Sequence, residues 1–245
     1  MTLQLHQPMA APGTPSSSPF CTKTEILLQM TANEFVITPE FVPSNGPKQK
    51  IPFLTDGDMV IGDSALIQKH LENNHQADFY KGLSRLERAT AELLIHAVEE
   101  KLYWVMVYAR WQIDAGWAIT EPAFFGMAPA SVRAAVSGEA RQDVLRNLWG
   151  QGTGRHTEAE AIQMGVDVIE NLGLYLGKED YFIADTPTPL DAVAYGTLIS
   201  LLEMPGSALL KDAILAQSNL CAFVDRMSAK FFPNALGAVA LRTAT

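Results

Sequence analysis

The stretch Ser16-Ser17-Ser18-Pro19-Phe20-Cys21-Thr22-Lys23 lies near the start of the chain, between a short apolar run and the pattern of an amphipathic helix. This position predicts a strand-to-helix junction, where backbone N–H groups lack helical partners and the helix dipole is positive. Such a junction suits a thiolate or another anion. Ser18-Pro19-Phe20-Cys21 also has the spacing of a C-x-x-C motif, with serine in place of the first cysteine. The stretch raises the question of whether this site handles a thiol that the chain does not itself supply.

The composition indicates an ordinary globular protein. The chain has 245 residues, of which 48% are hydrophobic and 18% are charged, enough for one large or two small domains. A net charge of −9 argues against nucleic acid or an anionic membrane as a general partner. No apolar run is long enough to span a bilayer, and the first residues lack the pattern of a signal peptide.

The two cysteines, Cys21 and Cys221, lie far apart in the sequence. Because they form no disulfide framework, a reduced cytoplasmic setting is expected. They are too few to build a zinc site alone, and no histidine stands at a metal-ligand spacing with them. No metal is therefore expected. The five histidines are His6, His70, His75, His96 and His156.

The first ~80 residues have the pattern of a small mixed α/β domain. Strands are expected at 3–7, 34–38, 51–54 and 59–62, with Asp56-Gly57-Asp58 as a hairpin turn. A helix is expected from Phe20 to near Asn33, with Lys23-Thr24-Glu25 facing outward. A second helix is expected to begin at a cap formed by Asp63-Ser64.

From Gly82 onward the pattern is helical, which predicts an all-α domain. Residues 82–112 form a long helical stretch, and 115–129, which contain glycines and prolines, are expected to break it. Thr157-Glu158-Ala159-Glu160 and Thr188-Pro189-Leu190-Asp191 are capping boxes that begin further helices. Tyr181-Phe182-Ile183 is expected to be extended. The predicted domains are 1–79 and 80–245.

Taken together, these features resemble the glutathione S-transferase family. Three motifs carry the resemblance, and a fourth concerns folding alone. The first three are Ser18-Pro19-Phe20-Cys21, Lys50-Ile51-Pro52-Phe53-Leu54 and Gly62-Asp63-Ser64-Ala65, and the fourth is Thr188-Pro189-Leu190-Asp191, which resembles the family's buried capping box. The resemblance implies a thioredoxin-like N-terminal domain followed by an all-helical C-terminal domain. The long Pro-rich loop before Ser18 is most similar to the branch that includes metaxin and failed-axon-connections proteins and their bacterial relatives.

The resemblance implies that Pro52 follows a cis peptide bond and that glutathione lies across the N-terminal domain. The backbone of Ile51 would pair with the cysteinyl unit of glutathione, Ser64 would bind the γ-glutamyl carboxylate, and Asp63 would bind the ammonium group. Lys50 would pair with the glycyl carboxylate, or it is a solvated loop lysine.

Ser18 is the predicted catalytic residue. A free thiol titrates near ~8.5, so a hydroxyl donor at a positive helix end would favour the thiolate. Ser18 would equally serve as a helix cap, and Ser16 and Ser17 are rivals for the thiol contact. Cys21 is expected to be buried and inert.

Four aromatic residues on the long helical stretch are expected either to line an acceptor pocket or to pack in the core. The leading function is a homodimeric, cytoplasmic glutathione transferase that attacks a small electrophile in a cleft between the domains. One alternative is a non-catalytic, metaxin-like interaction protein, and another is a thiol–disulfide enzyme that uses Cys21. The four aromatic residues are Tyr103, Trp104, Tyr108 and Trp111.

Overall fold

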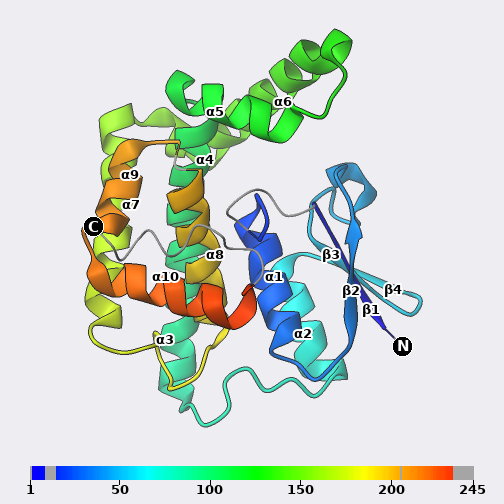
Figure 1. The fold of residues 1–245 in the computed structure, drawn as a ribbon, viewed down its shortest axis with the longest axis vertical. Helices are drawn as coiled ribbons and strands as arrows, with labels where there is room; N and C mark the ends of the chain where they lie inside the picture. Colours follow the sequence, from blue (N-terminus) through cyan, green and yellow to red (C-terminus); the bar gives the residue numbers. More distant parts are fainter. Residues whose placement is uncertain (1, 9–14, 205, 234–245) are drawn as a thin grey trace. The chain divides into compact units, whose positions relative to one another are not determined.

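The computed structural model of the chain describes residues 2–8, 15–204 and 206–233 (Figure 1). Two compact units are present. The first comprises Met1–Ile95, Lys178–Ser200 and Cys221–Thr245, and the second comprises His96–Gly177 and Leu201–Leu220. Each unit therefore combines segments that are distant in the sequence, and the domain boundary between residues 79 and 80 stays a prediction. Residues 234–245, the part of the tail after Pro233, lie outside the described residues.

The first unit contains a four-stranded sheet with the strand order β2-β1-β3-β4. The strands are β1 (Leu3–Gln7), β2 (Phe35–Pro39), β3 (Phe53–Asp56) and β4 (Met59–Gly62). β1 is parallel to β2 and antiparallel to β3, and β3 is antiparallel to β4. The predicted β3–β4 hairpin is confirmed, with Gly57 at the positive φ of 58° that such a turn requires. The mixed α/β character of this region is as predicted.

Two helices of the first unit lie beside the sheet (Figure 1). These are α1 (Pro19–Gln29) and α2 (Ser64–Asn74). α1 packs against α2, which also contacts β3 and β4. Three further helices belong to this unit over most of their length. They are α3 (Arg85–His96), α8 (Pro189–Glu203) and α10 (Ser218–Phe231).

The predicted outward face of α1 is wrong. Lys23, Thr24 and Glu25 expose only 1%, 0% and 9% of their surface. The polar pattern predicted one solvated side, but α1 is covered from several directions, by α2 on one side and by Gly196 of α8 at its first turn. Glu25 keeps a partner in this environment because the Gln7 Nε2 donates to its carboxylate at 2.7 Å.

The second unit has helices and connecting turns but no strand in its described segments. It contains a π-helical turn (Ala97–Leu102), α4 (Tyr103–Trp111), α5 (Asp114–Phe125), α6 (Ala130–Gln151), α7 (Glu158–Leu176) and α9 (Ala208–Leu215). The predicted break at 115–129 is wrong over most of its length, because α5 continues through Pro122. Pro122 is exposed, so water can bind the carbonyl that its missing N–H leaves unpaired. No helix in the described ranges is both long and apolar enough to cross a membrane.

Both predicted capping boxes are confirmed. Thr157 and Glu160 bond reciprocally at the start of α7. At the start of α8, the backbone N–H and the hydroxyl of Thr188 both donate to the Asp191 carboxylate at 2.8 Å. The N–H of Phe182 donates to the other oxygen of Asp191 at 2.9 Å. Tyr181–Ile183 forms bends rather than the predicted extended segment, since this hydrogen bond draws the chain around the Asp191 side chain.

Candidate functional site

The register of the sheet brings two predicted motifs to one edge. Phe53, the first residue of β3, pairs with Gly62, the last residue of β4. Pro52 and Asp63 each lie one residue beyond this pair, so they leave the sheet on neighbouring strands, which are ~4.8 Å apart. His6 of β1 pairs with Phe53, so β1 also ends at this edge. The chain then leads from β1 to the N-terminus of α1.

Ser18 occupies the N-cap position of α1, directly before Pro19. Its backbone is extended, with φ −107° and ψ 122°, but its hydroxyl makes no capping hydrogen bond. The Ser18 hydroxyl instead hydrogen-bonds the thiol of Cys21. The position of Ser18 indicates a helix cap. Its hydroxyl nevertheless lies at the start of the helix without making the capping hydrogen bond.

The three neighbouring serines differ in their burial. Ser16 is fully buried, and its Oγ accepts a hydrogen bond from the backbone N–H of Ser18 at 3.2 Å. Ser17 and Ser18 are half-buried. Ser16 therefore holds the turn together, whereas the other two present part of their surface to solvent. The assignment of the thiol contact to Ser18 stays a prediction.

Cys21 lies inside the molecule, with none of its surface exposed. Burial raises the pKa of its thiol to about 12, and the hydroxyls of Ser18 and Ser16 offset only part of that rise. The side chain is therefore a protonated thiol at neutral pH. This environment favours the predicted packing role over a redox role. Cys221 is also buried.

Asp63 and Ser64 form the start of α2. The Asp63 Oδ1 accepts from the N–H groups of Ala65 at 2.9 Å and Leu66 at 3.3 Å, so the predicted cap is present. Asp63 has a φ of 85°, which is strained for a residue other than glycine. Such strain persists where the surrounding structure enforces it, and it clusters at ligand-binding positions. Asp63 is exposed, and Ser64 beside it is only 6% exposed.

The Lys50-Ile51-Pro52 motif leads into β3. The Ile51–Pro52 peptide bond is cis. Pro52 is buried, Ile51 is half-buried and the Lys50 side chain is exposed. Lys50 is therefore placed where either a ligand carboxylate or water can reach it, and its role in binding stays a prediction.

The four aromatic candidates of α4 lie in the second unit. Tyr108 is buried among Val107, Leu148 and Ala161, and its hydroxyl donates to the carbonyl of His156 at 3.2 Å. Tyr103, Trp104 and Trp111 are partly buried against the same cluster. These contacts show the core packing that was one of the two expectations. A role in acceptor binding stays a prediction.

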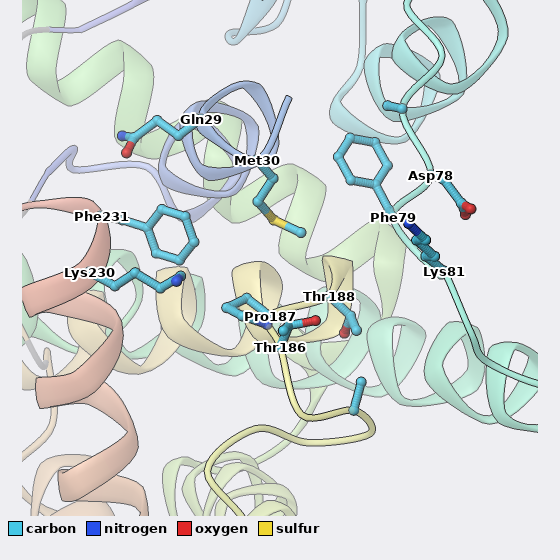
Figure 2. A pocket seen from close by; sticks show the side chains of 12 residues that line it. Gln29, Met30, Asp78, Phe79, Lys81, Thr186, Pro187, Thr188, Lys230 and Phe231 are labelled. Atoms are coloured by element: carbon cyan, nitrogen blue, oxygen red, sulfur yellow. The ribbon is translucent and has the colours of Figure 1, made fainter. Parts of the chain in front are cut away.

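A cavity of about 410 Å³ lies elsewhere in the first unit, at the C-terminal end of α1. Figure 2 shows Met30, Phe79 and Phe231 around it, with Lys81 and Lys230 nearby. No predicted site residue lines it. Sequence reasoning missed this cavity because its walls come from segments near residues 30, 80, 187 and 231, and no local motif marks them.

Comparison with known proteins identifies relatives over most of the chain. Residues 19–116 match the model of the glutathione S-transferase N-terminal domain, and residues 166–227 match that of the glutathione S-transferase C-terminal domain. The chain is 28% identical to the isoprene-epoxide glutathione S-transferase of Rhodococcus sp. (strain AD45), over 89% of this chain and 94% of the relative. It is 27% identical to Failed axon connections of Drosophila melanogaster, over 95% of this chain but only 58% of that protein.

Solved structures show the same fold. A glutathione S-transferase of Methylobacterium radiotolerans, solved in complex with glutathione sulfonate, superposes with a TM-score of 0.61 at 17% identity, covering 96% of this chain and 95% of that one. Two family models that match residues 19–116 and 166–227, and a fold shared along nearly the whole length, agree with the predicted fold class. The chain belongs to the glutathione S-transferase family.

Proposed function

We propose that this protein is a glutathione transferase that joins the glutathione thiol to a small electrophile. The observation that supports this most strongly is the convergence of Pro52 and Asp63 at one sheet edge through the Phe53–Gly62 pair. α2 begins at that edge, directly after β4, and β1 ends there before the chain reaches α1. A peptide ligand with charged ends would meet a strand start and a helix N-terminus together.

Each group of glutathione has a partner of matching chemistry in this arrangement. The backbone of Ile51 pairs with the cysteinyl unit as an added strand would. The first turn of α2 and the Ser64 hydroxyl bind the γ-glutamyl carboxylate. Asp63 caps α2 through Oδ1, so its Oδ2 can receive the γ-glutamyl ammonium. Lys50 pairs with the glycyl carboxylate from its exposed position.

Ser18 then acts on the thiol, turning its hydroxyl from the Cys21 sulfur toward the ligand. Its hydroxyl donates a hydrogen bond to the sulfur, and the N-terminus of α1 adds positive potential, so the thiol loses its proton to water more readily. The thiolate attacks an electrophilic carbon, and an S–C bond forms. With an epoxide, the C–O bond breaks and the resulting alkoxide takes a proton from water. The relative named for isoprene epoxide makes an epoxide the first acceptor to try.

The test combines binding and turnover. Calorimetric titration with glutathione is expected to show binding at millimolar concentration or below, and ultraviolet absorbance is expected to show thiolate formation below the ordinary thiol pKa. Turnover of an isoprene epoxide is followed by loss of free thiol. Absence of glutathione binding at millimolar concentration would overturn the proposal.

Three single variants test which serine contacts the glutathione thiol. Ser18→Ala is expected to raise the pKa of bound glutathione and to lower turnover, while glutathione affinity changes little. Ser17→Ala is the matched control in the same turn, and Ser16→Ala is expected to act through the fold because its side chain is buried. If Ser17→Ala instead produces the pKa change, the catalytic role moves to Ser17.

A non-catalytic interaction protein is the second candidate, favoured by the similarity to Failed axon connections along nearly the whole chain. It predicts a folded protein without thiolate formation or turnover. The cytoplasmic location, expected from the small number of cysteines, and the homodimer, expected from the family resemblance, remain proposals. Light scattering of the purified chain tests the homodimer.

A further inference from the structure

Two histidines and one aspartate converge in the first unit, away from the glutathione motifs. The Nε2 of His70 lies 2.8 Å from the Oδ2 of Asp56, and the Nε2 of His75 lies 2.7 Å from the same oxygen. The three ligand-type atoms all lie within 4.8 Å of one another. The side chains expose only 8% (His70), 14% (Asp56) and 18% (His75) of their surface. The cluster is thus shielded from bulk water but remains reachable.

Two elements, β3 and α2, hold this cluster in place. Asp56 ends β3 at the hairpin turn, His70 lies in the last turns of α2, and His75 is the C-cap residue of that helix. The rings of His70 and His75 have centroids 5.4 Å apart and are tilted by 57°, so both ring edges face the carboxylate rather than stacking. The geometry is therefore fixed by the sheet–helix packing and not by one flexible loop.

An asparagine contacts the far nitrogen of each ring. The amide nitrogen of Asn74 lies 3.1 Å from the Nδ1 of His70 and also donates to the carbonyl oxygen of His70 at 3.3 Å, so metal binding would require this amide to turn away. The Oδ1 of Asn33 lies 3.2 Å from the Nδ1 of His75. When this oxygen accepts from Nδ1–H, the Nε2 lone pair of His75 points at the shared centre. Outer partners of this kind orient histidines that ligate metals.

We propose that Asp56, His70 and His75 bind a divalent transition-metal ion of the zinc type. Two imidazole nitrogens and one carboxylate oxygen suit Zn²⁺ rather than Mg²⁺ or Ca²⁺, which prefer oxygen ligands. Zinc bonds of ~2.0–2.1 Å in a tetrahedral arrangement separate ligand atoms by about 3.3 Å. Each Asp56–histidine separation would therefore open by roughly half an ångström, and water would complete the tetrahedron.

The proposed ion lies at the opposite end of α2 from the glutathione motif. Asp63 caps the start of the helix, whereas His70 and His75 are near its end. A helix of 11 residues is about 16 Å long. The ion would join the β3–β4 hairpin to the end of α2 and, through Asn33, to the turn that follows α1. This site therefore stands independently of the proposed transferase chemistry.

Sequence reasoning did not find this site because its residues share no compact motif. Asp56 and His70 are 14 positions apart, and His70 and His75 are separated by five, so they do not repeat on one helical face. Only the end of α2, where His75 leaves the helical path, turns both rings toward Asp56.

The experiment uses the full chain without a polyhistidine tag, stripped of metal by a chelator and titrated calorimetrically with ZnCl₂. One equivalent of Zn²⁺ is expected to bind with micromolar affinity or tighter and to raise Tm, whereas Mg²⁺ is expected to do neither. Co²⁺ in place of Zn²⁺ is expected to give the visible absorption of a four-coordinate nitrogen–oxygen site.

Variants separate this site from other histidines. His75→Gln and His70→Gln are each expected to abolish stoichiometric Zn²⁺ binding, and Asn33→Ala is expected to weaken it by ~10–100-fold. His96→Gln is the matched control, since His96 is exposed in α3 and should leave binding unchanged. Circular dichroism checks that each variant is folded. If a histidine variant does not fold, the Zn²⁺ affinity of Asn33→Ala still tests the proposal. Failure of the wild-type chain to bind Zn²⁺ at micromolar free concentration, or undiminished binding by the His70→Gln/His75→Gln double variant, would overturn the proposal.

Discussion

The carbonyl oxygen of Pro19, in the first turn of α1, lies against the backbone of Gly196 in α8. A Cβ added to Gly196 would stand 2.7 Å from that oxygen, closer than such atoms approach in folded proteins. Gly196 therefore allows α8 to pack directly on the turn that presents Ser18. The position of the proposed catalytic hydroxyl depends on a glycine almost 180 residues further along the chain.

Gly196→Ala is expected to displace the start of α1, because the backbone carbonyl of Pro19 cannot yield as a flexible side chain would. The expected cost is about 1–3 kcal/mol of unfolding free energy, with a weaker effect of Ser18 on the pKa of bound glutathione. Chemical denaturation and the thiolate titration measure the two effects. Gly138→Ala in α6 is the control, since a Cβ there meets nothing within 4 Å, and it should stabilise α6 by roughly 0.5–1 kcal/mol. Equal stability of the Gly196→Ala and wild-type proteins would contradict this account of the contact.

Asp63 combines a structural and a proposed binding role, and two substitutions separate them. Asp63→Asn keeps a side-chain oxygen that can cap α2 but removes the charge offered to the γ-glutamyl ammonium. It is expected to lower glutathione affinity by about tenfold or more and to leave Tm nearly unchanged. Asp63→Ala removes the cap as well, at a cost of about 1 kcal/mol. Calorimetry with glutathione and thermal melts of both variants give the comparison. An unchanged affinity in Asp63→Asn would limit Asp63 to capping.

The Cys21 thiol should resist alkylation in the native protein. Its pKa is raised to about 12 by burial, so on the order of one molecule in 10,000 carries the thiolate at pH 8, and that thiolate is enclosed. Iodoacetamide labelling followed by peptide mass spectrometry is expected to modify Cys21 only as fast as the chain opens. Labelling in denaturant provides the positive control. Rapid modification of the folded chain near neutral pH would revive the thiol–disulfide alternative.

The two capping boxes differ in burial, which predicts different stability costs. Asp191 is fully buried and accepts from Phe182 N–H and from both the N–H and the hydroxyl of Thr188. Asp191→Ala leaves these buried donors unpaired and is expected to cost about 3 kcal/mol or more. Thr157→Ala, in the exposed box of α7, is expected to cost about 1 kcal/mol. Urea unfolding of both variants measures the difference, and similar costs would show that the burial of the Asp191 box adds nothing.

Sequence reasoning located the local features of the fold. The strands at 3–7 and 59–62 have the predicted bounds, and the Asp56-Gly57-Asp58 turn and both capping boxes are present. Each of these depends on residues a few positions apart, whose hydrogen bonds and backbone preferences are formed within one turn. The site motifs were found for the same reason, since each spans only about four residues.

Features that depend on contacts between segments distant in the sequence were not predictable in this way. The burial of Lys23, Thr24 and Glu25 follows from helices packed around α1, and the continuity of α5 through Pro122 follows from that residue's exposure. Likewise, the sheet register and the end of α2 decide that Asp56 meets His70 and His75.

The stretch from Ser16 to Lys23 contains both kinds of information. By itself the sequence determined that a helix begins close behind Ser18, because serine favours the cap position and proline the first helical position. The predicted start at Phe20 lies one residue after the observed start at Pro19. Only the tertiary structure decided that Ser16 is enclosed, that Ser18 bonds to a buried Cys21, and that Lys23 points into the protein. The physical reason is that helix capping is a local interaction, whereas burial depends on which distant segments, here α2 and Gly196 of α8, pack against the helix.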